Sequence, residues 1–230
     1  MVANGILPST AQSPSNFVQT LFTIHNSDAL FRQGVSSHQY KKDSLVATAE
    51  AMENNLYILV HGEVNLFYTN AKGRRIVMAT LKPGAIFGEG ALAMPSAPNT
   101  FAEAGDDSEV WAIPASEANA MMIQYPVLSW ALLQTYGERL LQVENSLEDV
   151  AYKTMPTRLA ALLLERRDKE TGLIKDLSHQ RLADYLGTYR ETVSAILRDF
   201  KRQGLVELGY RRITILDEET LADIAEIWEW

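Results

Sequence analysis

The chain of 230 residues contains no cysteine. Without thiols it can form neither disulfides nor thiolate zinc sites nor a cysteine-ligated iron–sulfur cluster. Histidine is also scarce, and no two of the four histidines have the His-x-x-x-His spacing that places both on one helix face. We therefore expect no metal and no other cofactor. The four residues are His25, His38, His61 and His179.

Long apolar runs are missing as well. No stretch of 18 consecutive apolar residues occurs, so no transmembrane helix is expected. The N-terminus lacks both the charged start and the apolar stretch of a secretory signal. The sequence also lacks the Gly-x-Ser-x-Gly, phosphate-loop and His-Glu-x-x-His motifs of common enzyme classes. We expect a cytoplasmic protein that is not an enzyme and has no membrane partner.

Charge is unevenly distributed along the chain, whose net charge is −8. Residues 1–152 hold 8 basic and 15 acidic side chains, whereas residues 153–216 hold 13 basic and 8 acidic ones. Residues 217–230 hold six acidic side chains and no basic one. A positive segment between two acidic ones provides a localised field for binding phosphates, so double-stranded DNA is the expected partner.

The most informative segment is 177–206, which has the pattern of two helices joined by a tight turn. Ser178 can cap the first helix, and Gly187 can end it in a left-handed conformation. The second helix has two different faces. Its predicted buried stripe is Val193, Ile196, Leu197 and Phe200, and its polar face is Arg190, Glu191, Ser194 and Arg198.

A helix-turn-helix places its second helix in the major groove of DNA and reads bases with that helix's first residues. Arg190 suits guanine and Glu191 suits cytosine. The alternative is a plain amphipathic hairpin, in which Thr188 and Glu191 only form a capping box. The predicted base-reading residues are Tyr189, Arg190, Glu191, Ser194 and Arg198, and the predicted phosphate contacts are Gln180, Arg181, Thr188, Lys201, Arg202, Arg211 and Arg212.

Upstream, residues 40–114 show short β-type runs separated by turn residues. Many short strands with glycine and proline turns predict a sandwich or a roll. Together with the helical segments around it, this pattern predicts an α+β fold. The clearest strands are 56–60, 64–68, 76–81 and 110–113, and the clearest turn is 70–73.

A long helix is expected from Pro126 onward. Its apolar residues recur at alternating spacings of three and four, which is the pattern of a coiled-coil seam. The favoured partner is a second copy of the chain, and the alternative is packing on the chain's own β-roll. Pro156 disfavours helix at Met155 and indicates a hinge near residues 153–156. The seam consists of Leu133, Tyr136, Leu140, Val143, Leu147 and Val150.

The two ends of the chain complete the expected organisation. Residues 1–16 are rich in serine, proline and asparagine and are predicted to be mobile, and helical spacing follows from Phe17 to Phe31. Residues 204–215 predict a β-hairpin wing with its turn at Gly209 and Tyr210. The acidic tail, with Leu221, Ile224, Ile227 and Trp228, predicts a short amphipathic helix. The expected domains are 17–125 (β-roll), 126–152 (dimerisation helix) and 153–230 (winged helix-turn-helix).

The run 186–194, Leu-Gly-Thr-Tyr-Arg-Glu-Thr-Val-Ser, resembles the recognition motif of the cyclic-AMP receptor protein/FNR (CRP/FNR) family of bacterial transcription regulators. Residues 56–64, Gly73 and residues 83–89 resemble the cyclic-nucleotide-binding β-roll of that family. The resemblance implies a homodimer on an inverted repeat, with RNA polymerase as a further partner. It also implies that Arg190 and Glu191 read a G·C pair in each half-site.

The resemblance locates an effector pocket, and there the chain departs from the family. Gly88 and Glu89 match the pair whose glutamate accepts a ribose hydroxyl. Asn99 stands where the family has the arginine that neutralises the cyclic phosphate, and Glu144 lies in place of a base-contacting serine. The positions of this degenerate pocket are Gly88, Glu89, Asn99, Thr100, Val143 and Glu144.

A buried phosphate without a cation is costly, so cyclic AMP is not the expected effector; another ligand or none is. The leading hypothesis is a homodimeric regulator that binds DNA independently of cyclic AMP. The alternative is a cyclic-nucleotide-responsive regulatory protein that acts on DNA or on a protein partner. Ala195 replaces a second DNA-reading arginine of the family, so the half-site is expected to differ at one base step.

Overall fold

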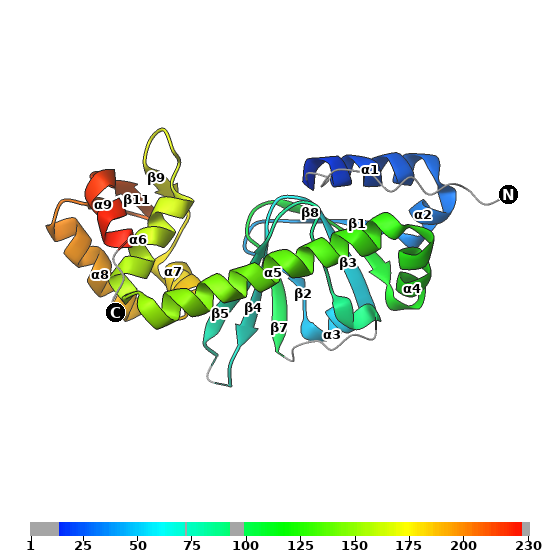
Figure 1. Cartoon of the computed structure of the whole chain (residues 1–230), viewed down its shortest axis with the longest axis horizontal. Coiled ribbons are helices and arrows are strands. Elements are labelled where there is room, and N and C mark those ends of the chain that lie inside the picture. The colour runs from blue at the N-terminus through cyan, green and yellow to red at the C-terminus, as the bar shows by residue number, and fades with distance from the viewer. Residues whose placement is uncertain (1–13, 72, 93–98, 227–230) are drawn as a thin grey trace. The chain divides into compact units, whose positions relative to one another are not determined.

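The computed structural model describes residues 14–71, 73–92 and 99–226, with side chains from residue 17 onward (Figure 1). The chain divides into two compact units. The first comprises Met1–Tyr68 and Ala79–Leu140, and the second comprises Thr69–Met78 and Leu141–Trp230. This division falls inside the long helix Pro126–Tyr152, whereas the sequence analysis placed one domain boundary at each end of that helix.

Two helices, α1 (Pro14–Ser27) and α2 (Ala29–Gly34), come first. Asp28 separates them as the N-cap of α2, where its carboxylate accepts hydrogen bonds from two backbone amides. The prediction of one helix over residues 17–31 is wrong, because this cap starts a new helix. The prediction of a mobile segment over residues 1–16 is wrong at its end, since residues 14–16 are helical; residues 1–13 lie outside the described part of the chain.

Short strands form two four-stranded sheets within the described residues, as the sequence predicted for a roll. Their orders along the sheets are β1-β8-β3-β6 and β2-β7-β4-β5. The four predicted strands are confirmed as β3, β4, β5 and β8, whereas the others were not predicted. The bounds are β1 (Ser36–Tyr40), β2 (Leu45–Ala47), β3 (Asn55–His61), β4 (Val64–Thr69), β5 (Arg75–Leu81), β6 (Ile86–Phe87), β7 (Thr100–Ala104) and β8 (Ser108–Pro114).

Alternate side chains of β3 enter two different apolar clusters. Leu56, Ile58 and Val60 pack with residues of the helices, while Tyr57 and Leu59 pack between the two sheets. Successive side chains of a strand point to opposite faces. Burial of both faces therefore explains why this strand is apolar throughout instead of alternating.

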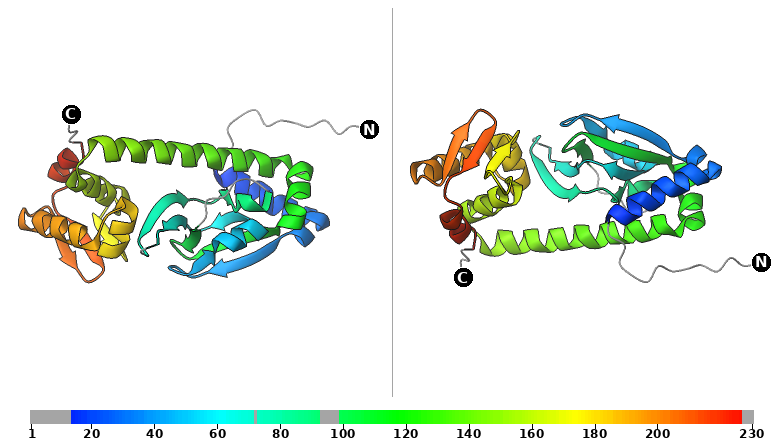
Figure 2. Two further views of the ribbon diagram at one scale, coloured as in Figure 1. Left: turned by 90° about the horizontal axis from the view of Figure 1, so that it is seen from below. Right: turned by 90° about the horizontal axis from the view of Figure 1, so that it is seen from above.

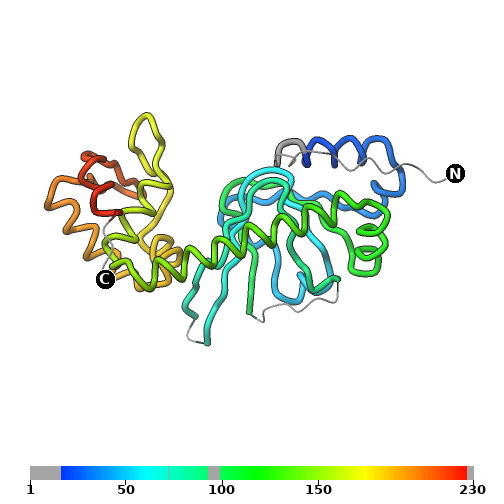
Figure 3. Tube along the Cα trace, in the orientation of Figure 1, coloured from blue at the N-terminus to red at the C-terminus, as the bar shows by residue number. Residues whose placement is uncertain are grey.

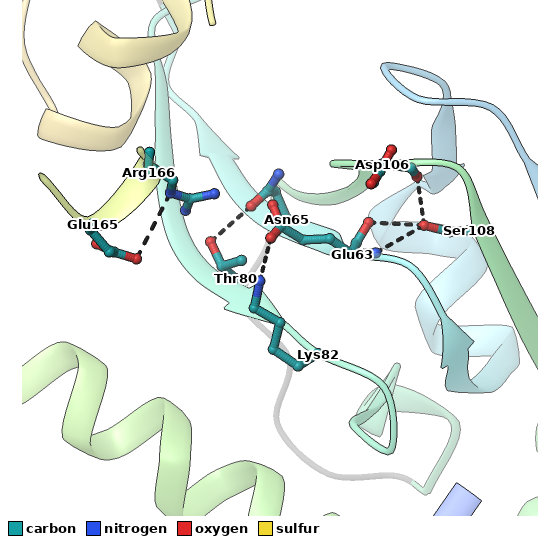
Figure 4. A network of polar contacts seen from close by, with 8 residues as sticks. All are labelled: Glu63, Asn65, Thr80, Lys82, Asp106, Ser108, Glu165 and Arg166. Carbon is teal, nitrogen blue, oxygen red and sulfur yellow. Dashed lines mark hydrogen bonds and ion pairs between the residues drawn. The ribbon is translucent and has the colours of Figure 1, made fainter. Parts of the chain in front are cut away.

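Polar contacts tie the turn between β3 and β4 to the start of β8, and a further hydrogen bond joins β4 to β5 (Figure 4). The Ser108 hydroxyl donates to the Glu63 carbonyl over 3.0 Å and accepts from the Glu63 amide over 3.1 Å. The buried Asn65 side chain accepts from the Thr80 hydroxyl over 2.9 Å. Buried polar groups with hydrogen-bond partners favour one strand register over others.

Helical elements flank the sheets, and the longest of them, α5, is one uninterrupted helix (Figure 2). It begins at the predicted proline and buries Leu128, Ala131, Leu132 and Thr135. The Thr135 hydroxyl accepts a buried hydrogen bond of 3.0 Å from the amide of Ile86. The bounds are α3 (Ala49–Asn54), η1 (Glu89–Leu92), α4 (Ala115–Gln124) and α5 (Pro126–Tyr152).

The predicted seam lies on another face of α5. Leu133, Leu140, Leu147 and Val150 are between 60% and 66% exposed. The alternative that this apolar stripe packs on the chain's own β-roll is therefore wrong for these four residues. Tyr136 is the exception, because it is partly buried against the helical core cluster.

The second unit contains a helix-turn-helix and a three-stranded sheet in the order β10-β11-β9; the chain path can be followed in Figure 3. The wing is confirmed, but its turn consists of Tyr210 and Arg211, because Gly209 still pairs with Arg212. The third strand was not predicted. The bounds are α6 (Met155–Arg166), β9 (Leu173–Lys175), α7 (His179–Leu186), α8 (Arg190–Arg202), β10 (Val206–Gly209), β11 (Arg212–Ile215) and α9 (Glu218–Ala225).

The prediction that Pro156 excludes helix at Met155 is wrong. Thr154 caps α6, and Pro156 lies in its first turn, where its missing N–H would have no intrahelical partner. The predicted acidic tail helix is confirmed as α9, in which Leu221 is buried; Ile227 and Trp228 lie outside the described residues. None of the helices described is long and apolar enough to cross a membrane.

Candidate nucleic-acid interface and effector pocket

The turn between α7 and α8 is built by local capping. The Ser178 hydroxyl accepts from the Arg181 amide over 3.1 Å at the start of α7. Gly187 ends that helix with φ 63° and ψ 35°, a left-handed conformation that only glycine adopts without steric cost. The Arg158 guanidinium donates to the Leu186 carbonyl over 3.0 Å. The predicted cap and turn are thus confirmed, and α7 and α8 pack together in one core cluster.

The polar face of α8 is exposed, as a DNA-reading helix requires. Arg190, Glu191 and Arg198 are exposed, while Val193 and Leu197 are buried against the core. Tyr189, and not Thr188, is the N-cap, and its side chain makes no capping bond. The alternative role of Thr188 and Glu191 as a capping box is therefore wrong, and Glu191 is available for another partner.

Two of the predicted contact residues are engaged within the protein. The Ser194 hydroxyl lies 2.9 Å from Nδ1 of His179, and the Gln180 amide donates over 2.9 Å to Asp184. Burial, followed by the charge of Arg190, lowers the pKa of His179, which favours the neutral ring at pH 7. His179 was not predicted as a site residue. Its signal in the sequence is its position directly after the capping serine of α7.

The wing lies beside these helices across an open cavity of about 500 Å³. His179 and Arg190 line it on the helix side, and Tyr210, Arg211 and Arg212 line it on the wing side. The predicted phosphate contacts Arg211 and Arg212 are both exposed. Tyr210, which the sequence placed in the turn without a role, is 94% exposed. We call this cavity, bounded by α7, α8 and the wing turn, the wing notch.

The Gly-Glu pair of the predicted effector pocket has a clear structural setting. Gly88 has φ 83°, and a Cβ atom there would clash with the Asn55 carbonyl oxygen. Glu89 pairs with Arg139 of α5 over 3.0 Å, and the two side chains are only 14% and 24% exposed. The Arg139 guanidinium also lies 5.3 Å from the ring centre of Tyr136. Burial and the charge of Glu89 raise the pKa of Tyr136 to about 12.

The other predicted pocket residues are less enclosed. Asn99 is exposed, with φ 60°, and Thr100 begins β7. Val143 and Glu144 are both exposed on α5. Glu89 is therefore the one predicted pocket residue, among those described, for which a charged partner is seen, and that partner, Arg139, was not predicted. The described histidines and carboxylates include no group of three that could hold a metal ion.

Comparisons with protein families match both parts of the chain. Residues 37–125 match the cyclic nucleotide-binding domain, and residues 157–224 match the Crp-like helix-turn-helix domain. The global nitrogen regulator of Synechococcus elongatus is 30% identical over 176 residues, which cover 73% of this chain and 79% of that protein. The cyclic AMP receptor protein of Thermus thermophilus is 29% identical over 170 residues, which cover 74% and 79%.

Solved structures show the same architecture. A transcriptional regulator of the CRP/FNR family from Eubacterium rectale superposes with a TM-score of 0.76, covering 90% of this chain and 100% of that one. At 24% identity this likeness shows the fold alone. A CRP-family regulator from Thermus thermophilus, at 25% identity, has a TM-score of 0.69 and covers 82% and 96%.

The Glu89–Arg139 pair predicts a stability effect. Replacing Arg139 with glutamine leaves a largely buried carboxylate without its cation, which we expect to lower the free energy of unfolding by about 1–2 kcal/mol, less than for a fully buried pair. The double variant Glu89→Gln/Arg139→Gln should lower the free energy of unfolding by less than the two single variants do when their effects are added. The measurement is urea denaturation followed by circular dichroism.

The matched control is Lys41→Gln, which breaks an ion pair to Asp107 whose side chains are 88% and 58% exposed. Exposed pairs are screened by solvent, so this variant should unfold close to the wild-type midpoint. If Lys41→Gln and Arg139→Gln lower the free energy of unfolding equally, burial of the Glu89–Arg139 pair does not make it more important for stability than an exposed pair.

Proposed function

The chain belongs to the CRP/FNR family of DNA-binding transcription regulators, and we propose that it acts as a homodimer on an inverted-repeat site, independently of cyclic AMP. In this proposal the β-roll at 17–125 is a sensor-type domain, 126–152 is the dimerisation helix, and 153–230 binds DNA in the cytoplasm. RNA polymerase is the partner through which bound regulator acts on transcription.

The observation that carries the DNA proposal is the exposed start of α8. Arg190 and Glu191 occupy the first turn of this helix, where a recognition helix meets base edges. An arginine can donate two hydrogen bonds to guanine, and a glutamate can accept from cytosine. Arg198 is exposed on the same helix, and the basic segment 153–216 supplies the field that attracts phosphates. In this proposal Ser194 acts together with His179, because the Ser194 hydroxyl is hydrogen-bonded to the His179 ring.

The dimer proposal is supported by the exposed stripe on α5. Four aliphatic seam residues remain 60% exposed or more, and they follow one another after seven, seven and three residues, as positions of a heptad repeat do. An apolar stripe of this regularity is favourable when an identical helix covers it. A two-fold dimer presents two copies of α8, which then fit half-sites about one helical turn of DNA apart. This geometry favours an inverted repeat.

Independence of cyclic AMP is supported by the state of Glu89. A ribose hydroxyl would have to compete with Arg139 for this carboxylate, since the two form an ion pair over 3.0 Å. The position expected to neutralise a cyclic phosphate is Asn99, which carries no charge and is exposed. Glu144, one turn beyond Arg139 on α5, adds negative charge to the same helix. An anionic ligand is disfavoured by this set of charges.

The test of the proposed function is selection of DNA from a random pool by the purified full chain without ligand, followed by binding to the selected duplex with and without cyclic AMP. We expect an inverted repeat and an unchanged affinity on addition of cyclic AMP. Enrichment only in the presence of cyclic AMP would favour a cyclic-nucleotide-responsive regulator. No enrichment under either condition would contradict DNA reading and favour action on a protein partner.

Arg190→Ala should abolish discrimination at one G·C step of each half-site, because its two hydrogen bonds to guanine are lost. The expected cost at that step is about 1–3 kcal/mol, measured by fluorescence anisotropy on the selected duplex and on its substituted versions. Arg202→Ala is the matched control, since Arg202 lies in the last turn of α8 and pairs with Asp199 over 2.8 Å. A variant at Arg190 that still rejects the substituted step would refute its role.

Leu140→Lys should separate the dimer, because it places a charge in the seam of both helices. We expect the dissociation constant to rise by about 100-fold or more, as measured by sedimentation equilibrium. Leu30→Lys is the matched control, because Leu30 is 63% exposed and Leu140 is 60% exposed, but Leu30 lies on α2. If the Leu140 variant remains as dimeric as this control, the seam is not the interface.

A further inference from the structure

The tip of the wing carries an exposed aromatic side chain. Tyr210 is 94% exposed, more than any other large apolar or aromatic side chain in the described part of the chain. It is followed by Arg211 and Arg212, and both are exposed. The wing turn thus combines an aromatic ring that makes no contribution to the core with two cationic side chains, and both kinds of group are used to contact nucleic acids.

This tip is held rigidly. Arg211 has φ 49°, a left-handed conformation that costs a residue with a side chain of its size. Its carbonyl accepts from the Asp176 amide over 2.9 Å, which ties the turn to the segment before α7. Ile213, in the strand that follows, is buried and pairs with Ile174 of β9. The backbone that carries Tyr210 is thus braced, and a braced backbone loses little conformational entropy on binding.

The two arginines beside Tyr210 have different settings. A Cβ atom at Gly209 would lie 3.2 Å from Nε and 3.5 Å from Nη2 of Arg212, so the Arg212 head group folds back along the first strand of the wing. Arg212 of the wing and Arg190 of α8 both line the wing notch. Arg211 belongs to the turn itself, next to Tyr210.

The wing notch is suited to a DNA strand, because arginines from α8 and from the wing line it. Each sugar-phosphate backbone separates a major groove from a minor groove. When α8 lies in the major groove, the backbone beside it lies in the notch of about 500 Å³, between the cations Arg190 and Arg212. The wing turn on the far side of the notch then faces the neighbouring minor groove.

We propose that Tyr210 and Arg211 enter the minor groove beside each half-site and make binding depend on the flanking base pairs, with A·T pairs favoured over G·C pairs. This rests on the proposed DNA-binding function. A·T-rich minor grooves are narrow and have a strongly negative potential, which attracts an arginine. The G·C pair places the guanine 2-amino group in the floor of the groove, in the way of the ring. In this arrangement Arg212 contacts only the phosphates.

The experiment uses the full chain and duplexes that share the selected half-sites but carry A·T, G·C or inosine·cytosine pairs in the flanks. An inosine·cytosine pair matches G·C in the major groove and A·T in the minor groove, because it lacks the 2-amino group. We expect the A·T and inosine·cytosine flanks to bind roughly tenfold more tightly than the G·C flank. An inosine·cytosine flank that behaves like G·C would overturn the proposal.

The variant Tyr210→Ser/Arg211→Ala should reduce this flank ratio to about twofold or less, while discrimination between the selected and a substituted half-site stays intact. Arg212→Ala is the control, and it should weaken binding to all three flanks by the same factor, with a lower salt slope. A flank ratio that survives in the double variant overturns the proposal. Loss of half-site discrimination in the wild type on every flank overturns the proposed function itself, and this inference with it.

Discussion

The buried hydrogen bond from the Ile86 amide to the Thr135 hydroxyl determines which way α5 faces. A helix repeats every ~3.6 residues, so anchoring it at one position sets the direction of every other side chain. With Thr135 and Leu128 turned inward, Leu133 and Leu140 must point outward, and Arg139 comes within 3.0 Å of Glu89. The surface offered to a second copy and the ion pair in the pocket thus depend on the same anchorage.

The Glu89–Arg139 pair also bears on how such a regulator is controlled. A ligand shifts a protein between states only by binding one of them better. Here the carboxylate that a nucleotide sugar would need is already neutralised by a side chain of α5. If the protein acts as the proposed dimer, independently of cyclic AMP, control falls to the amount of the protein, because a dimer that assembles by mass action occupies its site according to its own concentration.

The sequence predicts the features that depend on neighbouring residues. The cap at Ser178, the turn at Gly187 and the start of α5 at Pro126 follow from local backbone chemistry, and all are confirmed. The two helices at the N-terminus were merged in the prediction because the apolar spacing continues through Asp28. Its role as a cap is supported by Tyr125, whose hydroxyl donates to it over 2.8 Å from 97 residues away.

The features that were missed depend on contacts between distant segments. Ser194 looks like a base-reading residue on α8, but its hydroxyl lies beside His179, fifteen residues earlier. Arg139 lies fifty residues from Glu89, and no spacing rule joins them. The strand β9 has only three residues, Leu173–Lys175, and it is stabilised by pairing with β11 rather than by its own pattern.

The setting of Gly88 has a consequence for how such chains diverge. A Cβ at this position would collide with the Asn55 carbonyl, so any substitution is opposed by misfolding, whether or not a ligand is ever bound. Asn99 is exposed, and an exchange there meets the cost of its left-handed backbone, φ 60°, but its side chain is not enclosed by the core. The fold therefore constrains these two positions of the predicted pocket unequally. Because Gly88 is required by its close contact with Asn55 in the folded chain, its presence is no sign by itself that the protein senses a nucleotide.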